Sequence, residues 1–249
     1  MCIRDSNGGG VTTSGAQAYT GKVLLGNDAL LTGTSVTLSN GADGAYALEI
    51  DGATSLTGAI GAVTKLASLT LDGAATLNAG SIATTGGQRY KGAVTLGSDH
   101  TLSTTTGGVA FDAALDGARN LRVVSTAGGD VSFDAVGGAT QRLGSLKVDT
   151  AGTTAFNGTV YAASVWTDAP GAVSIKGARI DATGVINLGE LVTLGSNVTL
   201  KGANVTLGGG VNSTDEQQGL TIDCLLYTSW HAYAGLMLKF SVSPAELPS

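Results

Sequence analysis

The chain is poor in the residues on which most catalytic and metal sites depend. Its 249 residues include two cysteines, two histidines and three prolines, and 5% are aromatic. Only 13% are charged, against roughly 25% in typical soluble domains. The two cysteines, Cys2 and Cys224, stand in the hexapeptides MCIRDS at 1–6 and CLLYTS at 224–229. The stretch between these hexapeptides therefore has neither disulfides nor thiolate metal sites.

The two hexapeptides resemble translations of the two strands of a sequencing-library transposase adapter. We interpret 1–6 as adapter-derived, and 224–249 as a second adapter-derived segment with an unrelated tail. Neither segment is expected to belong to the fold of the native protein. The tail holds two of the three prolines, Pro244 and Pro248, and none of the motifs found elsewhere in the chain. Residues 7–223 are expected to be a piece of a longer protein, cut at both ends.

Charge and hydropathy argue against several classes of function. The net charge is −6, and there is no cluster of lysine and arginine such as phosphate-backbone binding requires, so no nucleic-acid partner is expected. No apolar run approaches the roughly 18 residues of a membrane helix, so we expect no membrane insertion. Hydrophobic residues nevertheless reach 43% in short alternating runs, which argues against disorder.

An internal repeat is the strongest positive signal. Residues 14–31, SGAQAYTGKVLLGNDALL, return at 85–102 as TGGQRYKGAVTLGSDHTL, and VTLGSNVTL at 192–200 is a partial third copy. Gln17 of the first copy corresponds to Gln88 of the second. The matched residues stand on alternate positions, and alternate side chains of a strand point to opposite sides. We expect the copies to be successive rungs of a stacked array around one core.

Short runs between Gly, Asn, Asp and Thr turns fill the chain and predict an all-β fold. Dipeptides such as Asn-Gly at 40–41 and Asp-Gly at 72–73 suit positive-φ turns in hairpins and in solenoid corners alike. Even strand spacing and core residues of small to medium size favour a right-handed parallel β-helix (β-solenoid) over stacked antiparallel sandwiches. Coils of roughly 20–25 residues would give about nine coils and a rod of about 40 Å.

The expected repeat units are about 11–82 and 83–161, with a partial unit at 162–223. The expected strands are 17–25, 34–38, 45–50, 66–71, 88–96, 107–112, 119–124, 130–134, 143–148, 153–161, 172–176, 191–194 and 203–207.

The second copy carries a resemblance to a known family. Its pattern Thr-x-Gly-x-Gln-x-Tyr-x-Gly-x-Val-x-Leu-Gly-x-Asp is followed by Val-x-Phe and by Leu-Asp-Gly-Ala. These motifs resemble repeats of filamentous-haemagglutinin-like adhesins, the β-strand-repeat surface proteins of Gram-negative bacteria, over most of 11–161. The resemblance implies a right-handed parallel β-helix that is secreted through an outer-membrane transporter, by two-partner secretion or as an autotransporter. It further implies display at the bacterial cell surface and attachment to host or bacterial glycans or proteins.

No residue is expected to have a catalytic, cofactor-binding or metal-binding role. Gln17 and Gln88 are interpreted as structural residues that form a side-chain ladder or cap a turn. Asp28, Asp99 and Asn197 occupy equivalent turn positions, where the capping of backbone groups explains the exchange of Asp and Asn. The tandem Gly-Gly-x-Gly-x-Asp nonapeptide of calcium-binding β-helices is absent, so no calcium is expected.

Two side chains with potential chemistry stand apart from these. His100, whose counterparts in the other copies are Ala29 and Val198, is expected at the surface without a partner for base catalysis. Trp166 either packs beneath a loop or offers a platform on which carbohydrate stacks, and the sequence leaves both open.

The favoured function is a non-enzymatic shaft segment of such an adhesin, which serves in cell attachment, biofilm formation or aggregation. One alternative is a fragment of a β-helical polysaccharide-degrading enzyme. That chemistry needs acids, or acids with Lys and Arg, aligned on one face across adjacent coils, and acids within about 6 Å of one another would revive it. The other alternative is a passive surface-layer or stalk protein without a ligand.

Overall fold

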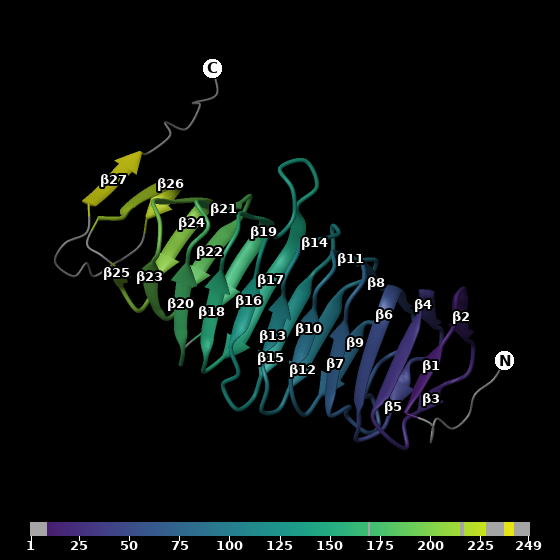
Figure 1. Ribbon diagram of the computed structural model, residues 1–249. Coiled ribbons are helices and arrows are strands. Elements are labelled where there is room, and N and C mark those ends of the chain that lie inside the picture. The colour runs from purple at the N-terminus through teal and green to yellow at the C-terminus, as the bar shows by residue number, and fades with distance from the viewer. Residues whose placement is uncertain (1–8, 169, 215–216, 228–236, 242–249) are drawn as a thin grey trace.

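The computed structural model describes residues 9–168, 170–214, 217–227 and 237–241. Its described residues contain no helix, 58% strand and all-parallel pairing, stacked as a β-solenoid of about 11 turns (Figure 1). Successive coils follow one another along a single axis, from the purple N-terminal end to the yellow C-terminal end. The predicted parallel β-solenoid is confirmed. None of the described residues forms a helix that could span a membrane.

The coils are more numerous than the nine expected because several are short. Some residues that pair between neighbouring coils, such as Val36 and Thr54, have a short separation in the sequence. Others, such as Leu121 and Leu146, have a longer one. The length of a coil therefore varies along the solenoid.

Each coil has three sides, called face 1, face 2 and face 3 in the order in which the chain passes through them. Face 1 contains β1 (Gly10–Thr12), the first parts of β4 (Ala29–Leu38) and β6 (Ala47–Leu56), β7 (Ser68–Leu71), β10 (Gln88–Tyr90), β13 (Val109–Phe111), β16 (Val131–Phe133), β18 (Thr153–Phe156), β20 (Ala172–Ile175), β23 (Leu191–Leu194) and β25 (Val211–Ser213).

Face 2 contains β2 (Ala16–Tyr19), the second parts of β4 and β6, β8 (Ala75–Leu77), β11 (Val94–Leu96), β14 (Leu115–Asp116), the first part of β19 (Val160–Thr167), β21 (Arg179–Ala182), the first parts of β24 (Val198–Leu207) and β26 (Gly219–Tyr227), and β27 (Met237–Ser241). Face 3 contains β3 (Val23–Leu24), β5 (Ala42–Asp43), β9 (Ser81–Thr84), β12 (His100–Thr104), β15 (Leu121–Ser125), β17 (Leu143–Thr150), β22 (Val185–Leu188) and the remaining parts of β19, β24 and β26.

A corner divides several of the expected strands. In the expected strand 88–96, β10 ends at Tyr90 and β11 begins at Val94. The inward-facing residues keep their alternate spacing through the corner, so the sequence pattern looks like one strand. Gly92 makes this corner possible, because a Cβ there would lie 2.4 Å from the backbone of Gly73 in the preceding coil.

A column of stacked aromatic rings fills the middle of the core behind face 1. Tyr90, Phe111, Phe133 and Phe156 occupy the same position in four successive coils. Their ring centroids are 4.7, 5.4 and 5.7 Å apart, and neighbouring planes differ by no more than 14°. This offset face-to-face contact follows from the parallel register, which places identical positions one strand spacing apart.

The copies of the repeat share the core but lie on different faces. From Gln17 on face 2, the strand pairing leads coil by coil through Val36, Thr54 and Ala75 to Val94. Gln88, the repeat counterpart of Gln17, comes before Val94 in the chain and lies on face 1. The repeat is therefore shorter than a whole number of coils, and the second copy is displaced by one face.

The third copy continues the displacement. The valine of the Val-x-Leu motif lies on face 3 as Val23, on face 2 as Val94 and on face 1 as Val192. All three valines are at most 5% exposed. The expectation of one shared core is confirmed, and within it each copy is displaced by one face from the copy before it.

The adapter interpretation concerns the origin of the sequence and stays a prediction. Residues 1–6 lie outside the described residues, and of 224–249 only 224–227 and 237–241 are described. Strand β26 runs through 224–227 and pairs with β24, and Cys224 lies in the core at 7% exposure.

Candidate functional site on face 3

A row of large polar and aromatic side chains crosses the outer side of face 3. The register places Arg122, Lys147, Trp166 and Asn187 at matching positions in four successive coils. They alternate along their strands with the core residues Val123, Val148, Val165 and Ile186, which are buried. Trp166 is 39% exposed. Its packing beneath a loop is thereby excluded, and the alternative of an open platform stands.

Asp149 holds the two cations of this row. Arg122 Nε donates a hydrogen bond of 2.8 Å to Asp149 Oδ2, and Lys147 Nζ lies 3.3 Å from Asp149 Oδ1. Burial alone would raise the pKa of Asp149, but the hydrogen bonds and charges of Arg122 and Lys147 hold it below its ordinary value. Asp149 is therefore ionised at neutral pH.

Two further acids follow Asp149 in the next two coils. Burial, together with the charge and a hydrogen bond of Asp149, raises the pKa of the exposed Asp168. Glu190 is 3% exposed, and burial raises its pKa although the Thr167 hydroxyl donates a hydrogen bond to its carboxylate. Asp149 and Asp168 thus stand beside the row with pKa values shifted in opposite directions, while Glu190 is buried behind it.

The spacing of these acids limits what they can do chemically. Asp149 and Asp168 directly follow the paired residues Val148 and Thr167 of adjacent coils, so they stand one strand spacing apart, about 4.8 Å, and meet the 6 Å criterion. Glycosidases need two carboxyl groups that face the sugar or a water, whereas Asp149 is engaged by Arg122 and Lys147. Within the described residues, no three His, Cys, Asp or Glu side chains are grouped so that they could hold a metal ion.

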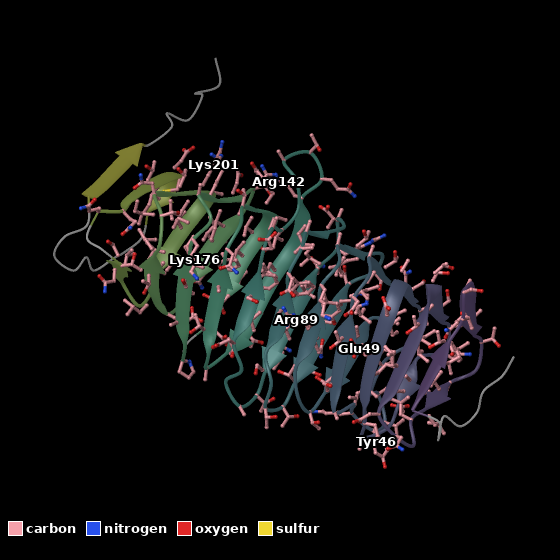
Figure 2. All side chains as sticks on the ribbon, viewed as in Figure 1. Tyr46, Glu49, Arg89, Arg142, Lys176 and Lys201 are labelled. Carbon is pink, nitrogen blue, oxygen red and sulfur yellow. The ribbon has the colours of Figure 1, made fainter. Side chains whose placement is uncertain are left out.

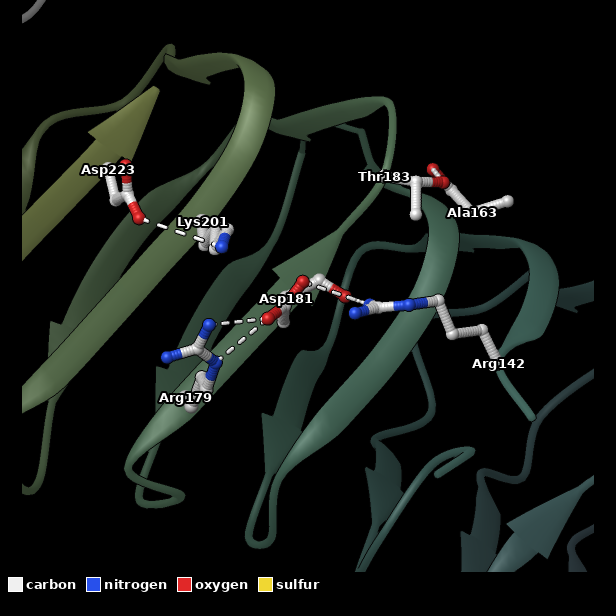
Figure 3. Close-up of polar contacts among 7 residues, drawn as sticks. All are labelled: Arg142, Ala163, Arg179, Asp181, Thr183, Lys201 and Asp223. Atoms are coloured by element: carbon white, nitrogen blue, oxygen red, sulfur yellow. Dashed lines mark hydrogen bonds and ion pairs between the residues drawn. The ribbon is translucent and has the colours of Figure 1, made fainter. Parts of the chain in front are cut away.

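A second polar cluster lies on face 2 and holds a loop in place (Figure 3). Arg142, at the end of the loop that projects above β14 and β17 in Figure 1, donates to the Asp181 carbonyl at 2.7 Å and lies 2.9 Å from Asp181 Oδ1. Arg179 Nε donates to Asp181 Oδ2 at 3.0 Å. Burial would raise the pKa of Asp181, but Arg179 and Arg142 keep it below its ordinary value.

The Arg142 guanidinium also lies 5.2 Å from the centre of the Tyr161 ring. Beside this cluster a shallow groove of about 440 Å³ extends towards Lys201, which is 3.9 Å from Asp223. The groove is also lined by Cys224, which the sequence assigns to the adapter-derived segment. We interpret the Asp181 cluster as a clamp that holds the loop through Arg142, and not as a binding site.

The glutamines of the repeat are structural, as predicted. Gln17 Nε2 donates to the Thr32 carbonyl at 2.7 Å, and Gln88 Nε2 donates to the Ser103 carbonyl at 3.0 Å. Gln17 is 6% exposed and Gln88 is 2% exposed.

The capping role of the three turn residues is also confirmed. Each accepts a hydrogen bond from a backbone N–H of the following coil: Asp28 Oδ1 from Ala47 at 2.8 Å, Asp99 Oδ1 from Asn120 at 2.9 Å, and Asn197 Oδ1 from Gly219 at 2.6 Å. Because only an acceptor oxygen is needed, Asp and Asn are interchangeable.

The expected surface position of His100 is wrong. His100 is 3% exposed, and its Nε2 accepts a hydrogen bond from the Gly80 N–H at 3.1 Å. Its Nδ1 lies 2.9 Å from the Ser98 carbonyl, so the neutral tautomer with the proton on Nδ1 satisfies both contacts. The apolar counterparts Ala29 and Val198 were the available signal that this position faces the core.

Charged side chains elsewhere are spread over the outer surface, as Figure 2 shows for Glu49, Arg89 and Lys176 on face 1. Most cations pair with an acid of the same or the next coil, as in Arg89–Asp112 at 2.6 Å and Lys91–Asp72 at 2.8 Å. Such exposed pairs contribute little to stability.

Sequence reasoning did not single out Asp149, Asp168, Glu190 or Asp181. The signal for the first two was their separation along the chain, which is close to one coil and becomes informative only once the coil length is known. Nothing in the local sequence distinguishes Glu190 from a surface acid.

A scan against protein-family models, a search of curated proteins and a search of solved structures each found no match. The resemblance to filamentous-haemagglutinin-like adhesins therefore stays a prediction from the motifs.

Proposed function

We propose that this chain is part of the shaft of a secreted bacterial adhesin, whose task is to extend from the cell surface and present binding modules. The observation that carries the proposal is the unbroken core, in which buried Val, Leu, Ile and aromatic residues continue in register through about 11 coils. Because each coil contacts only its neighbours, such an array gains length without loss of local stability.

The outer surface supports the same proposal. The Asp and Asn caps and many of the ion pairs join one coil to the next, so they strengthen stacking. A passive surface-layer or stalk protein would share this design and differ in having no ligand. In line with the motifs, we propose an outer-membrane transporter as secretion partner, and glycans or proteins of host or bacterial surfaces as ligands of the whole adhesin.

A polysaccharide-degrading enzyme is the second candidate. The opposite pKa shifts of Asp149 and Asp168 favour it, since paired acids with separated pKa values are typical of acid–base catalysis. The engagement of Asp149 by Arg122 and Lys147 argues against it. We therefore place catalysis second.

Two experiments separate these functions. Sequencing of the DNA that flanks this coding region should reveal further coils and a secretion domain for the outer membrane; an intracellular enzyme domain in their place would overturn the shaft. Incubation of the purified chain with a panel of polysaccharides should release no reducing ends or unsaturated products. Release that disappears in Asp168→Asn would establish the enzyme instead.

A further inference from the structure

Trp166 lies at the centre of a polar grid on the outer side of face 3. Along its own strand the neighbouring outward residues are Ser164 and Asp168, and across the sheet they are Lys147 and Asn187. Lys147 and Asn187 lie about 4.8 Å away, at the spacing of adjacent strands. The indole is thus surrounded at short range by hydroxyl, amide, ammonium and carboxyl groups.

The row that contains Trp166 is straight and long. Arg122, Lys147, Trp166, Asn187 and Thr206 continue in register across five coils, a length of about 19 Å along the solenoid axis. A linear polymer that lies along the axis could contact every member of the row.

The charges of the grid balance. Arg122 and Lys147 are 51% and 46% exposed, yet both are engaged by Asp149, and Asp168 adds a second carboxyl group beside them. Two cations and two carboxyl groups give no net positive charge, in a chain whose net charge is −6. A polyanion would gain no long-range attraction here.

A protein partner also fits poorly. Stable protein interfaces bury about 800 Å² on each side around a central group of apolar and aromatic residues. Trp166 is the single large exposed hydrophobic residue of this row; the other exposed ones, Leu24, Leu30, Tyr46, Val63 and Leu191, lie on other faces or other coils among the described residues.

We propose that Trp166 and its polar neighbours form a binding subsite for a neutral, linear glycan that lies along the solenoid axis. The flat face of the indole packs against the C–H side of a pyranose ring, while its polar surroundings exchange hydrogen bonds with the hydroxyl groups. Lys147 and Asn187 donate to sugar oxygens, and Asp168 accepts from sugar hydroxyls. The subsite rests on the proposed adhesin function, since it gives the shaft a ligand of its own.

The test uses tryptophan fluorescence of the full chain in a Trp230→Phe background, which leaves Trp166 as the single indole. Titration with cellohexaose, a neutral linear glycan, should change the Trp166 emission saturably. Trp166→Ala, followed by calorimetric titration, should weaken binding at least about tenfold, as the loss of a central aromatic anchor does. Asn187→Ala should weaken it several-fold. Tyr46→Ala is the matched control, because Tyr46 is similarly exposed at 38% but lies elsewhere, and should bind as the parent does.

Hexagalacturonate, a polyanion of the same number of sugars, should bind more weakly than cellohexaose. No saturable change up to millimolar cellohexaose, unchanged affinity in Trp166→Ala, or preference for hexagalacturonate would each overturn the subsite. None of these results bears on the proposal that the chain is part of a shaft, which the sequence of the flanking DNA tests separately.

Discussion

Gln17 and Gln88 make the same hydrogen bonds from different faces of the solenoid. In each case Nε2 donates to a backbone carbonyl six residues earlier and to another fifteen residues later. The tyrosine two residues further on, Tyr19 or Tyr90, donates its hydroxyl to Oε1 of the glutamine. The Gln-x-Tyr motif therefore specifies a corner between two strands, whichever faces those strands belong to.

Replacement of this glutamine should be costly. Gln88→Leu leaves the Tyr90 hydroxyl and the Ile82 and Ser103 carbonyls without their buried partner, so we expect a loss of about 2 to 4 kcal/mol in the free energy of unfolding. Urea denaturation followed by circular dichroism measures it. Gln141→Leu, on the exposed loop, is the matched control and should change stability by no more than about 0.5 kcal/mol. Equal effects of the two substitutions would contradict the corner role.

The aromatic column should respond to the size of its members. Phe133→Ala removes the ring between Phe111 and Phe156 and opens a cavity, with an expected loss of about 3 to 5 kcal/mol. Phe133→Leu places there the residue found at the same position as Leu71 and Leu194, and should lose less than about 2 kcal/mol. Thermal unfolding compares the two. A similar melting temperature for both variants would show that the column does not depend on close packing.

His100 should make the protein less stable in mild acid. Burial lowers the pKa of His100 below its ordinary value of 6.5, so the unfolded chain binds the proton more tightly than the folded chain does. The stabilising contribution is fully present above pH 6.5 and is lost as the pH falls below it towards the folded-state pKa. We expect His100→Leu to remove this dependence.

The measurement for His100 is the difference in unfolding free energy between wild type and His100→Leu at several pH values from 8 down to 5. A difference that stays constant over that range would contradict the neutral, buried imidazole.

Glu190 should behave in the opposite sense. Burial raises its pKa above the ordinary value of 4.5, so the folded state binds the proton more tightly and loses stability as the pH rises from that value through the folded-state pKa. Glu190→Gln keeps an acceptor for the Thr167 hydroxyl without the buried charge, and should be more stable than wild type at neutral pH but not at pH 4. Glu49→Gln, on exposed face 1, should show no such gain. Denaturation at both pH values checks this.

Arg142 should anchor its loop. Arg142→Ala removes the contacts with Asp181 and Tyr161 while Arg179 still neutralises Asp181, so we expect a modest loss of about 1 to 2 kcal/mol. Hydrogen exchange of residues 137–142 should become faster, because the backbone of the loop loses its attachment to face 2. Lys176→Ala, on exposed face 1, should leave exchange in this loop unchanged. Hydrogen exchange that stays slow in Arg142→Ala would mean that the loop is held by its own contacts and not by Arg142.

Alternation of apolar residues, together with the internal repeat and the even spacing of the strands, was sufficient to predict the fold class, the shared core and the structural role of Gln17. These features depend on which side of the chain faces inward, and a period of two residues records that directly. Capping by Asp28 and Asn197 was predictable for a similar reason, because the exchange of Asp and Asn points to an acceptor oxygen.

Features that depend on the length of each coil escaped prediction. Pairs such as Asp149–Asp168 and the cluster around Asp181 form across coils, and coil length varies with the turns. The corner after Tyr90 was also missed, since inward residues keep their spacing through it. His100 was misplaced because a polar residue type was given more weight than its apolar counterparts.

The displacement of each copy of the repeat by one face changes the direction in which equivalent side chains point around the solenoid axis. An outward side chain shared by the copies points away from a different face in each of them, so the copies are arranged helically around the axis. A surface feature carried by the repeat would therefore be presented on face 3, face 2 and face 1 in turn, and not along a single side of the rod.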